Sequence, residues 1–139
     1  MGKRKHNSAE VKKAEMKTTY IAKLTDVPTS PRKMRIVADL VRLNDVEQAL
    51  AILKHSPKEA SGRLYKLLLS AIANWQAKNE GARMEDAQLY IKEIFVDSAR
   101  QLKRIRTAPQ GRAHRIRKRS NHVTLILDSR VELTEDNNN

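Results

Sequence analysis

The sequence predicts an α+β fold in which three helices pack on a three-stranded antiparallel sheet, with a long basic β-hairpin projecting from the body. Two β-prone runs flank an arginine-rich segment at about 98–120, and a third precedes three stretches of helical apolar spacing. The 139 residues and 40% hydrophobic content suffice for one modest core. We therefore expect a single domain over 18–133 and a disordered acidic, Asn-rich tail over 134–139.

The first element along the chain should be a basic arm. Residues 1–17 hold six Lys or Arg and two Glu without sustained apolar spacing, so the arm should be flexible unless a partner orders it. A frayed terminus is the plain alternative. The β-prone run 19–24 follows and predicts a strand that ends at Asp26-Val27-Pro28.

The first helix of the body should begin with Ser30 at the N-cap and Pro31 at the first helical position, where the missing N–H costs nothing. Its buried stripe is expected at helical spacing, at Met34, Val37, Leu40 and Val41.

Three basic residues of this helix, Arg32, Lys33 and Arg35, lie near its N-terminal end. Cations are unfavourable there in an isolated helix, because the same end attracts anions. A bound phosphate would reconcile the two preferences, and a solvated basic face is an equally simple alternative.

Two further helices are indicated by capping boxes. Asn44 with Glu47 should open the second, which stops at His55, and Ser56 with Glu59 should open the third, which ends at Gly81. Their buried faces are expected at Val46, Ala49, Leu50 and Leu53, and at Ala60, Leu64, Leu67, Leu68, Ala71, Ile72 and Trp75.

The last two strands, 88–97 and 121–133, should continue into the hairpin, which turns at Pro109-Gln110-Gly111. With Gln110 and Gly111 as a two-residue turn, apolar residues oppose each other at the base: Ile94 with Leu127, and Val96 with Leu125.

A β-bulge is also expected near Lys92-Glu93. The apolar positions of this strand change there from odd to even numbers, and one extra residue explains the change. The bulge would set Leu89 opposite Val131 and Ala87 opposite Leu133.

Positive charge is concentrated in two places. Of the net charge of +12, residues 98–127 supply +9 and residues 1–17 supply +4, which leaves −1 for the rest. The predicted register opposes like charges, which destabilises a sheet, and only Ile105 opposite Ile116 compensates. A polyanion should therefore lie along both faces of the hairpin. The like-charged pairs are Lys103 with Lys118, Arg104 with Arg117, and Arg106 with Arg115.

Catalytic and cofactor chemistry are not indicated. The four glycines are too far apart for a phosphate loop, the four histidines have no metal-ligand spacing, and there is no cysteine. We expect no enzyme activity, no metal and no cofactor. No apolar run approaches the roughly 20 residues of a membrane span, and no secretory signal follows the N-terminus, so the protein should stay in the cytoplasm.

The expected class of partner is folded RNA. Aromatic residues are nearly absent from the basic segment, so recognition should depend on phosphates and on RNA shape instead of base stacking. A DNA-bending protein with a basic β-arm is the first alternative, but such arms usually work from dimers, and no spare apolar stripe indicates a homo-oligomer. A membrane-surface module is the second, and it would need a basic amphipathic helix.

Several motifs, in one order over about 18–130, resemble the bacterial L twenty-two family of large-subunit ribosomal proteins. They are Ser30-Pro31-Arg32-Lys33-Met34-Arg35 with Val37-Ala38-Asp39-Leu40, Ser70-Ala71-Ile72-Ala73-Asn74, Ile94-Phe95-Val96-Asp97, Lys103-Arg104, Gly111-Arg112-Ala113, Lys118-Arg119 and His122-Val123-Thr124.

This resemblance implies a structural, non-enzymatic component of the large ribosomal subunit that aids assembly and contacts large-subunit rRNA and neighbouring ribosomal proteins. It implies that the hairpin tip, Thr107, Ala108, Pro109, Gln110 and Gly111, lines the nascent-peptide exit tunnel. The family commonly has Pro-Arg-Ala before the tip glycine, so this chain lacks a tip arginine. The expected rRNA-binding residues are Arg32, Lys33, Arg35, Arg100, Lys103, Arg104, Arg106, Arg112, Arg115, Arg117, Lys118, Arg119 and His122.

Overall fold

Three antiparallel strands form the sheet, in the order β1-β3-β2. The computed structural model describes residues 2–79, 83 and 86–131. Among them the α+β class and the three-stranded antiparallel sheet are confirmed, with four helices where three were expected. In chain order the elements are α1 (Lys3–Thr18), β1 (Tyr20–Val27), α2 (Pro31–Val41), α3 (Val46–His55), α4 (Glu59–Lys78), β2 (Leu89–Thr107) and β3 (Ala113–Ser129).

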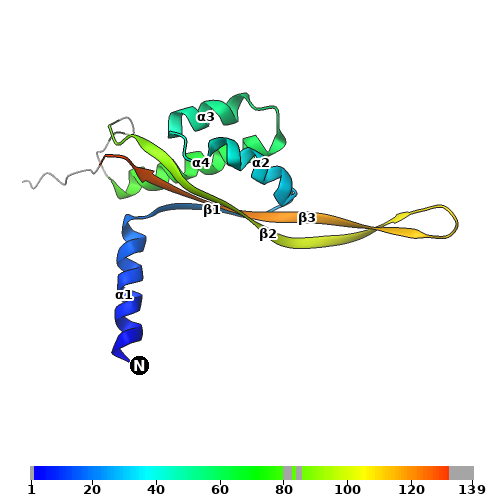
Figure 1. Cartoon of the computed structure of the whole chain (residues 1–139), viewed down its shortest axis with the longest axis horizontal. Helices are drawn as coiled ribbons and strands as arrows, with labels where there is room; N and C mark the ends of the chain where they lie inside the picture. Colours follow the sequence, from blue (N-terminus) through cyan, green and yellow to red (C-terminus); the bar gives the residue numbers. More distant parts are fainter. Residues whose placement is uncertain (1, 80–82, 84–85, 132–139) are drawn as a thin grey trace, which may run out of the picture.

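Figure 1 shows how these elements divide the molecule. Helices α2, α3 and α4 gather over one end of the sheet, β2 and β3 run on together beyond them, and α1 stands away from the rest. The expected tail at 134–139, the helix stop at Gly81 and the partner position Leu133 lie outside the described residues.

The core lies between the three body helices and one face of the sheet. All seven stripe residues predicted for α4 are buried, and Trp75 at its end is fully enclosed and meets the Tyr20 ring edge-on at 6.3 Å between ring centres. The stripe predicted for α3 is also confirmed, with Leu50 partly buried. In α2 the prediction for Leu40 was wrong: it is 50% exposed, and Ala38 takes the buried position because it lies between Met34 and Val41 on the same helical face.

The predicted helix starts were right for α2 and displaced for the other two. Ser30 is the N-cap of α2, but its carbonyl, not its hydroxyl, accepts the Met34 N–H at 3.1 Å. The N-cap of α3 is Asp45, since the Asn44 side chain donates back to the Leu40 carbonyl at 2.9 Å.

Helix α4 begins one residue after Lys58 instead of at the predicted Ser56 box. Ser56 is already the last-turn cap of α3, where its N–H donates to the Ile52 carbonyl at 3.1 Å. One residue cannot serve both helix ends, so the later start follows.

Most of the arm expected over 1–17 is helical in the structure, as α1 from Lys3 onward. Helix α1 has no buried residue among those described, which is why apolar spacing did not reveal it. Its last turn is closed by hydroxyl groups: Thr18 and Thr19 both donate to the Glu15 carbonyl, at 3.0 and 2.7 Å.

The bulge predicted at Lys92 is present, because Ile91 pairs with Leu127 and Glu93 with Ile126. The predicted register was wrong by two residues at the base: Ile94 faces Leu125 instead of Leu127, Val96 faces Val123 instead of Leu125, and Leu89 faces Ser129 instead of Val131. A two-residue slip leaves every side chain on its own face, so the apolar faces were still correct.

Two irregularities cause the slip. The loop at the tip has three residues, not two: the Ala108 N–H donates to the Arg112 carbonyl at 3.0 Å, and both Gln110 and Gly111 have positive φ, at 61° and 68°. A second bulge on β2 sets two residues, Ala99 and Arg100, into the space between the Ser98–Asn121 and Gln101–Arg119 pairs.

Candidate nucleic-acid interface

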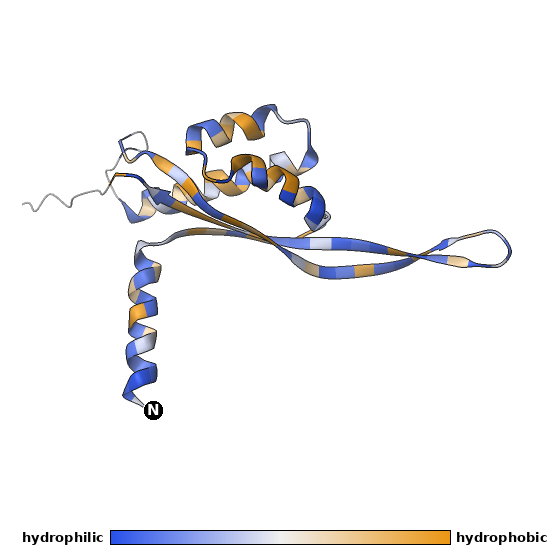
Figure 2. Ribbon diagram, in the orientation of Figure 1, coloured by the Kyte–Doolittle hydropathy of each residue, from blue (hydrophilic) through white to orange (hydrophobic). Residues whose placement is uncertain are grey.

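The parts of β2 and β3 from the second bulge outward, together with their loop, are here called the basic ribbon (residues 98–120). Figure 2 shows both of its strands as largely hydrophilic, in contrast to the strands beneath the helices. All nine of its cationic side chains are exposed: Arg100, Lys103, Arg104, Arg106, Arg112, Arg115, Arg117, Lys118 and Arg119.

The observed register changes which side chains meet across the ribbon. Of the three like-charged pairs predicted, none forms as stated, because the outer ladder is shifted by one residue. Lys103 now faces Arg117, but apolar residues face cations in the three pairs Leu102–Lys118, Arg104–Ile116 and Ile105–Arg115. The predicted contact of Ile105 with Ile116 is therefore also wrong. Repulsion between strands is weaker than predicted, since an apolar neighbour is tolerated better than a second cation.

Cations nevertheless occupy both faces of the ribbon. Side chains directly opposite each other in an antiparallel pair share a face, and successive pairs alternate. Lys103, Arg115, Arg117 and Arg119 therefore lie on one face, and Arg104, Arg106 and Lys118 lie on the other.

No carboxylate neutralises these groups within the described residues. The sequence has no acidic residue between Asp97 and Asp128, and none of the ion pairs in the described part of the chain includes a ribbon cation. Long cationic side chains without carboxylate partners on a narrow two-stranded element suit contact with the phosphates of a nucleic acid.

The three basic residues of α2 do not share one role. Arg32 and Lys33 are exposed. Arg35 reaches the neighbouring strand, where its Nε and Nη2 donate to the Val96 carbonyl at 3.1 and 2.9 Å. This arginine ties α2 to β2 close to the root of the ribbon.

Sequence reasoning missed a second arginine of this kind. Arg42 lies seven residues after Arg35 and therefore on the same side of α2. Its Nη2 donates to the Ile94 carbonyl at 3.2 Å, and its Nη1 pairs with Asp39 at 2.8 Å. The seven-residue spacing was the signal that could have identified both as clamps.

His122 also has a structural contact at the ribbon root. Its Nδ1 accepts the backbone N–H of Asp26 at 3.0 Å, at a bulge of β1 where Asp26 has a φ of 53°. The neighbouring Asn121 is fully buried and donates from Nδ2 to the Thr29 carbonyl at 2.6 Å. The pattern of the sequence gave no indication of Asn121, because a polar residue at a strand end usually indicates a turn.

The five tip residues lie together at the end of the ribbon farthest from the helices (Figure 1). None of Thr107 to Gly111 is charged, while Arg106 and Arg112 flank them. The ribbon therefore has a cationic stem and an uncharged end.

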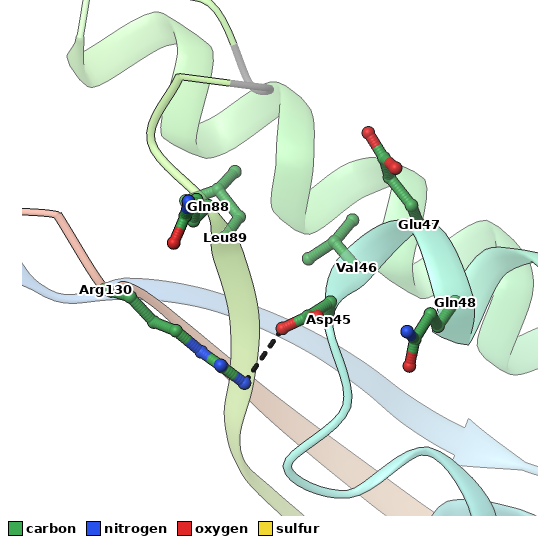
Figure 3. Close-up of a pocket in the computed structure, with 7 residues that line it drawn as sticks. All are labelled: Asp45, Val46, Glu47, Gln48, Gln88, Leu89 and Arg130. Carbon is green, nitrogen blue, oxygen red and sulfur yellow. Dashed lines mark ion pairs between the residues drawn. The ribbon is translucent and has the colours of Figure 1, made fainter.

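A polar hollow lies near the opposite end of the sheet (Figure 3). It is lined by Asp45, Val46, Glu47, Gln48, Gln88, Leu89 and Arg130. An ion pair between Arg130 Nη2 and Asp45 Oδ1, 2.9 Å long, spans it, and the Arg130 guanidinium lies 5.4 Å from the centre of the Tyr90 ring. Asp45 and Arg130 thus already have each other as ion-pair partners.

The described residues contain no cluster of three or more His, Cys, Asp or Glu side chains suited to a metal ion. Within the same residues, no helix is long and apolar enough to cross a membrane.

Among the described residues, two ionisable groups have shifted pKa values, and both belong to the body. The hydrogen bond and the charge of Asp128, 2.7 Å from the Lys92 Nζ, raise the pKa of Lys92. The hydrogen bond from Arg63, 2.6 Å long, lowers the pKa of Glu59, and the Thr29 hydroxyl contributes a second bond. These shifts reflect surface ion pairs and not a catalytic arrangement.

Comparison with known proteins adds a family to this geometry. The sequence profile described as "Ribosomal protein L22p/L17e" matches residues 22–128, from β1 to the end of β3. The chain is similar to proteins named "Large ribosomal subunit protein uL22" in Christiangramia forsetii (66% identity, 91% of this chain and 94% of the relative), Flavobacterium psychrophilum (62%, 93% and 94%) and Porphyromonas gingivalis (58%, 99% and 100%).

Proposed function

The chain belongs to the ribosomal protein L22p/L17e family, and from this premise we propose that its basic ribbon is the element that binds large-subunit rRNA. The protein is a structural, non-enzymatic constituent of the large ribosomal subunit. In the domain organisation that we propose, residues 18–133 act as one unit that carries the ribbon.

The observation that carries the proposal is the distribution of charge on the ribbon. Its cations lie on both faces, and no carboxylate lies between Asp97 and Asp128. An element that rested on an RNA surface would need cations on one face only. The ribbon is therefore suited to insertion between RNA segments, with phosphates on either side.

The assignment of individual residues follows from their contacts. The nine ribbon cations, with Arg32 and Lys33, are exposed and available to phosphates. Arg35 and His122 already bind backbone groups, so we assign them to positioning the ribbon root, with only their remaining N–H groups left for RNA.

We extend the proposal to the tip, which would line the nascent-peptide exit tunnel. A stem held by phosphates can cross a layer of RNA, and an uncharged end beyond it does not bind those phosphates. Thr107 to Gly111 form such an end.

Contacts with neighbouring ribosomal proteins are proposed for the outer side of α2. Two apolar side chains, Ile36 and Leu40, are exposed there one helical turn apart, and Leu43, just beyond the end of the helix, is exposed as well. Apolar groups in this arrangement favour packing against another protein over contact with RNA. We do not propose a homo-oligomer.

Three triple charge reversals test the ribbon. The first replaces Arg115, Arg117 and Arg119 with Glu on one face, and the second replaces Arg104, Arg106 and Lys118 with Glu on the other. The control replaces Lys54, Lys58 and Lys66 with Glu. These three are exposed residues of the body, and the net charge changes by the same amount as in the ribbon variants.

Mass spectrometry of purified large subunits would measure the incorporation of each variant. Both ribbon variants should fail to incorporate while the control incorporates. Normal incorporation of either ribbon variant would contradict insertion between two RNA surfaces.

The salt dependence of binding provides a second measurement. If about eight cations meet phosphates, affinity for deproteinised large-subunit rRNA should fall by roughly a thousandfold or more between about 50 and 200 mM salt. Equal affinity for duplex DNA of the same length would favour a DNA-bending function instead.

A further inference from the structure

Helix α1 is a second basic element, separate from the ribbon. It carries Lys3, Arg4, Lys5, Lys12, Lys13 and Lys17 against Glu10 and Glu15, and it lies before the segment that matches the family profile. Figure 1 shows it extending from the body in a direction far from that of the ribbon. The two elements therefore point toward different parts of a partner.

The composition of α1 indicates the chemistry of that partner. Its two large apolar residues, Val11 and Met16, are exposed and five positions apart, so they do not form a stripe. Protein interfaces usually need an apolar or aromatic centre, whereas nucleic-acid interfaces are polar and positively charged. A helix of this kind suits a polyanion.

The cations of α1 divide between two sides. Arg4, Ser8 and Lys12 follow one another at four-residue spacing, and together with Lys5 and Ala9 they line a shallow groove on the helix surface. Lys3, Lys13 and Lys17 lie on the opposite side, which they share with Glu10 and its partner His6 at 3.6 Å. Glu15 follows Lys12 by three positions and lies on the groove side, so each side carries three cations and one glutamate. The groove itself is what distinguishes the Arg4–Ser8–Lys12 side.

One side chain of the body holds the end of α1. Lys78, in the last turn of α4, donates from Nζ to three backbone carbonyls: those of Met16 at 3.1 Å, Lys17 at 3.3 Å and Thr19 at 2.7 Å. The same Nζ lies 5.5 Å from the centre of the Tyr20 ring. A cation is favourable at a helix C-terminus, where carbonyl groups lack partners, so this contact stabilises α1 and fixes its direction.

We propose that α1 is a second RNA-binding element, whose Arg4–Ser8–Lys12 side lies against large-subunit rRNA at a site distinct from that of the ribbon, with Lys78 as the residue that positions it. The proposal rests on the function proposed above for the ribbon. The proposal adds an RNA-binding site in residues that precede the segment matched by the family profile.

The absence of cysteine in the chain permits a direct test. Single cysteines introduced by Ser8→Cys in α1 and Ala113→Cys in the ribbon would each carry a tethered iron chelate that generates hydroxyl radicals. After incorporation into large subunits, rRNA cleavage near each position is mapped. Position 8 should cleave nucleotides different from those cleaved from position 113.

The outcomes separate the two proposals. Cleavage from position 113 alone would overturn the α1 proposal and leave the ribbon proposal standing, and it is the result expected if α1 rests on a neighbouring protein. Cleavage from position 8 alone would support α1 and overturn the ribbon. Cleavage from neither position would overturn both.

A matched pair of variants tests which side of α1 is used. One replaces Arg4, Lys5 and Lys12 with Gln, and the other replaces Lys3, Lys13 and Lys17 with Gln. Both remove three positive charges and keep residues that favour helices. The slope of log affinity for deproteinised rRNA against log salt should become shallower by about 2.7 in the first and by less than about 1 in the second. Equal changes would overturn the assignment of the side.

Lys78 is tested as a positioning residue. Lys78→Met removes the three hydrogen bonds, so cleavage from position 8 should spread over more nucleotides while cleavage from position 113 stays unchanged. Lys78→Arg keeps a cationic donor and should restore the narrow pattern. If Lys78→Met left the cleavage pattern from position 8 unchanged, Lys78 would not set the direction of α1.

Discussion

Lys103 lies directly opposite Arg117 in the ladder between β2 and β3, on the same face of the basic ribbon. Two cations in this position repel each other across the strands, and this ribbon contains no acidic residue to separate them. The free ribbon is therefore less stable than its hydrogen bonds alone would make it, and bound phosphates would remove the repulsion.

A single substitution should separate ribbon stability from RNA affinity. Lys103→Glu creates an opposite-charge pair with Arg117, worth about 0.5 kcal/mol relative to a neutral pair. Backbone amides of 103–117 in the free protein should then exchange more slowly, while affinity for rRNA falls. Hydrogen exchange and RNA binding on the same sample check both. Lys118→Glu is the control, because Leu102 and not a cation lies opposite; equal protection in the two variants would contradict the pairing.

The register of the ribbon shows where sequence reasoning succeeds and where it fails. Along the base, apolar residues alternate with polar ones, so the faces of Ile94 and Val96 and the bulge at Lys92 were predictable. Beyond Asp97, cations occur at both odd and even positions. No apolar periodicity remains there to reveal the bulge at Ala99-Arg100 or to distinguish a two-residue from a three-residue loop.

The same substitution should mainly lower protein stability at Arg35 and mainly weaken rRNA binding at Arg32. Arg35→Met removes two hydrogen bonds to the Val96 carbonyl and should lower the free energy of unfolding by about 1 kcal/mol. Arg32→Met should change it by less than about 0.5 kcal/mol, as expected for an exposed residue. Urea denaturation measures both. In rRNA binding the order should reverse, and an Arg35 variant of unchanged stability would show that the clamp contributes nothing.

Asn121 should be essential to the root of the ribbon. Replacing it with Ala leaves the Thr29 carbonyl without its donor and should cost about 1 to 3 kcal/mol of unfolding free energy. Asn74→Ala is the matched control, since Asn74 makes the same kind of bond to the Ile21 carbonyl, at 3.1 Å, in an exposed position. Thermal denaturation compares the two, and a control that costs as much as Asn121→Ala would argue against a special role of burial.

Stability at acid pH should depend on Glu59. Its pKa in the folded protein is lowered, chiefly by Arg63, below the ordinary value of 4.5. The carboxylate therefore contributes stability that is fully present above about pH 4.5 and is lost as the pH falls through the lower folded value. The difference in unfolding free energy between the natural protein and Glu59→Gln should thus shrink below pH 4.5. Glu47→Gln, which changes another first-turn glutamate, is the control. If the difference in unfolding free energy between the natural protein and Glu59→Gln grew as the pH fell, the predicted direction of the effect would be wrong.

The tip loop should tolerate change without loss of the subunit. Gly111 has a φ of 68°, so Gly111→Val strains the loop by about 1 to 2 kcal/mol and should move the tip. Phosphate contacts along the stem remain, so subunits should assemble while peptide stalling or tunnel-drug sensitivity changes. Gln110→Asn is the control, because Asn accepts positive φ. Failed assembly, or unaltered tunnel behaviour across a panel of stalling peptides, would show that the tip lies elsewhere.

The helices show a second limit of sequence reasoning. The faces of α3 and α4 followed from apolar spacing, and Leu40 was misplaced by a single position. Helix α1 has no such face, and the group that closes its end, Lys78, comes from sixty positions along the chain. Contacts of that kind depend on the folded arrangement and leave no local pattern.

The exposed ribbon also affects the fate of copies that find no ribosome. Its nine Lys and Arg residues are exposed, on β2, on β3 and in the loop between them. Each is a cleavage site for a protease that cuts after basic residues, and a transiently open strand is its natural substrate. RNA that covers the ribbon would block all nine sites at once. We therefore expect the feature proposed to hold the protein in the subunit to make a surplus copy susceptible to degradation, so that the protein's lifetime would depend on assembly.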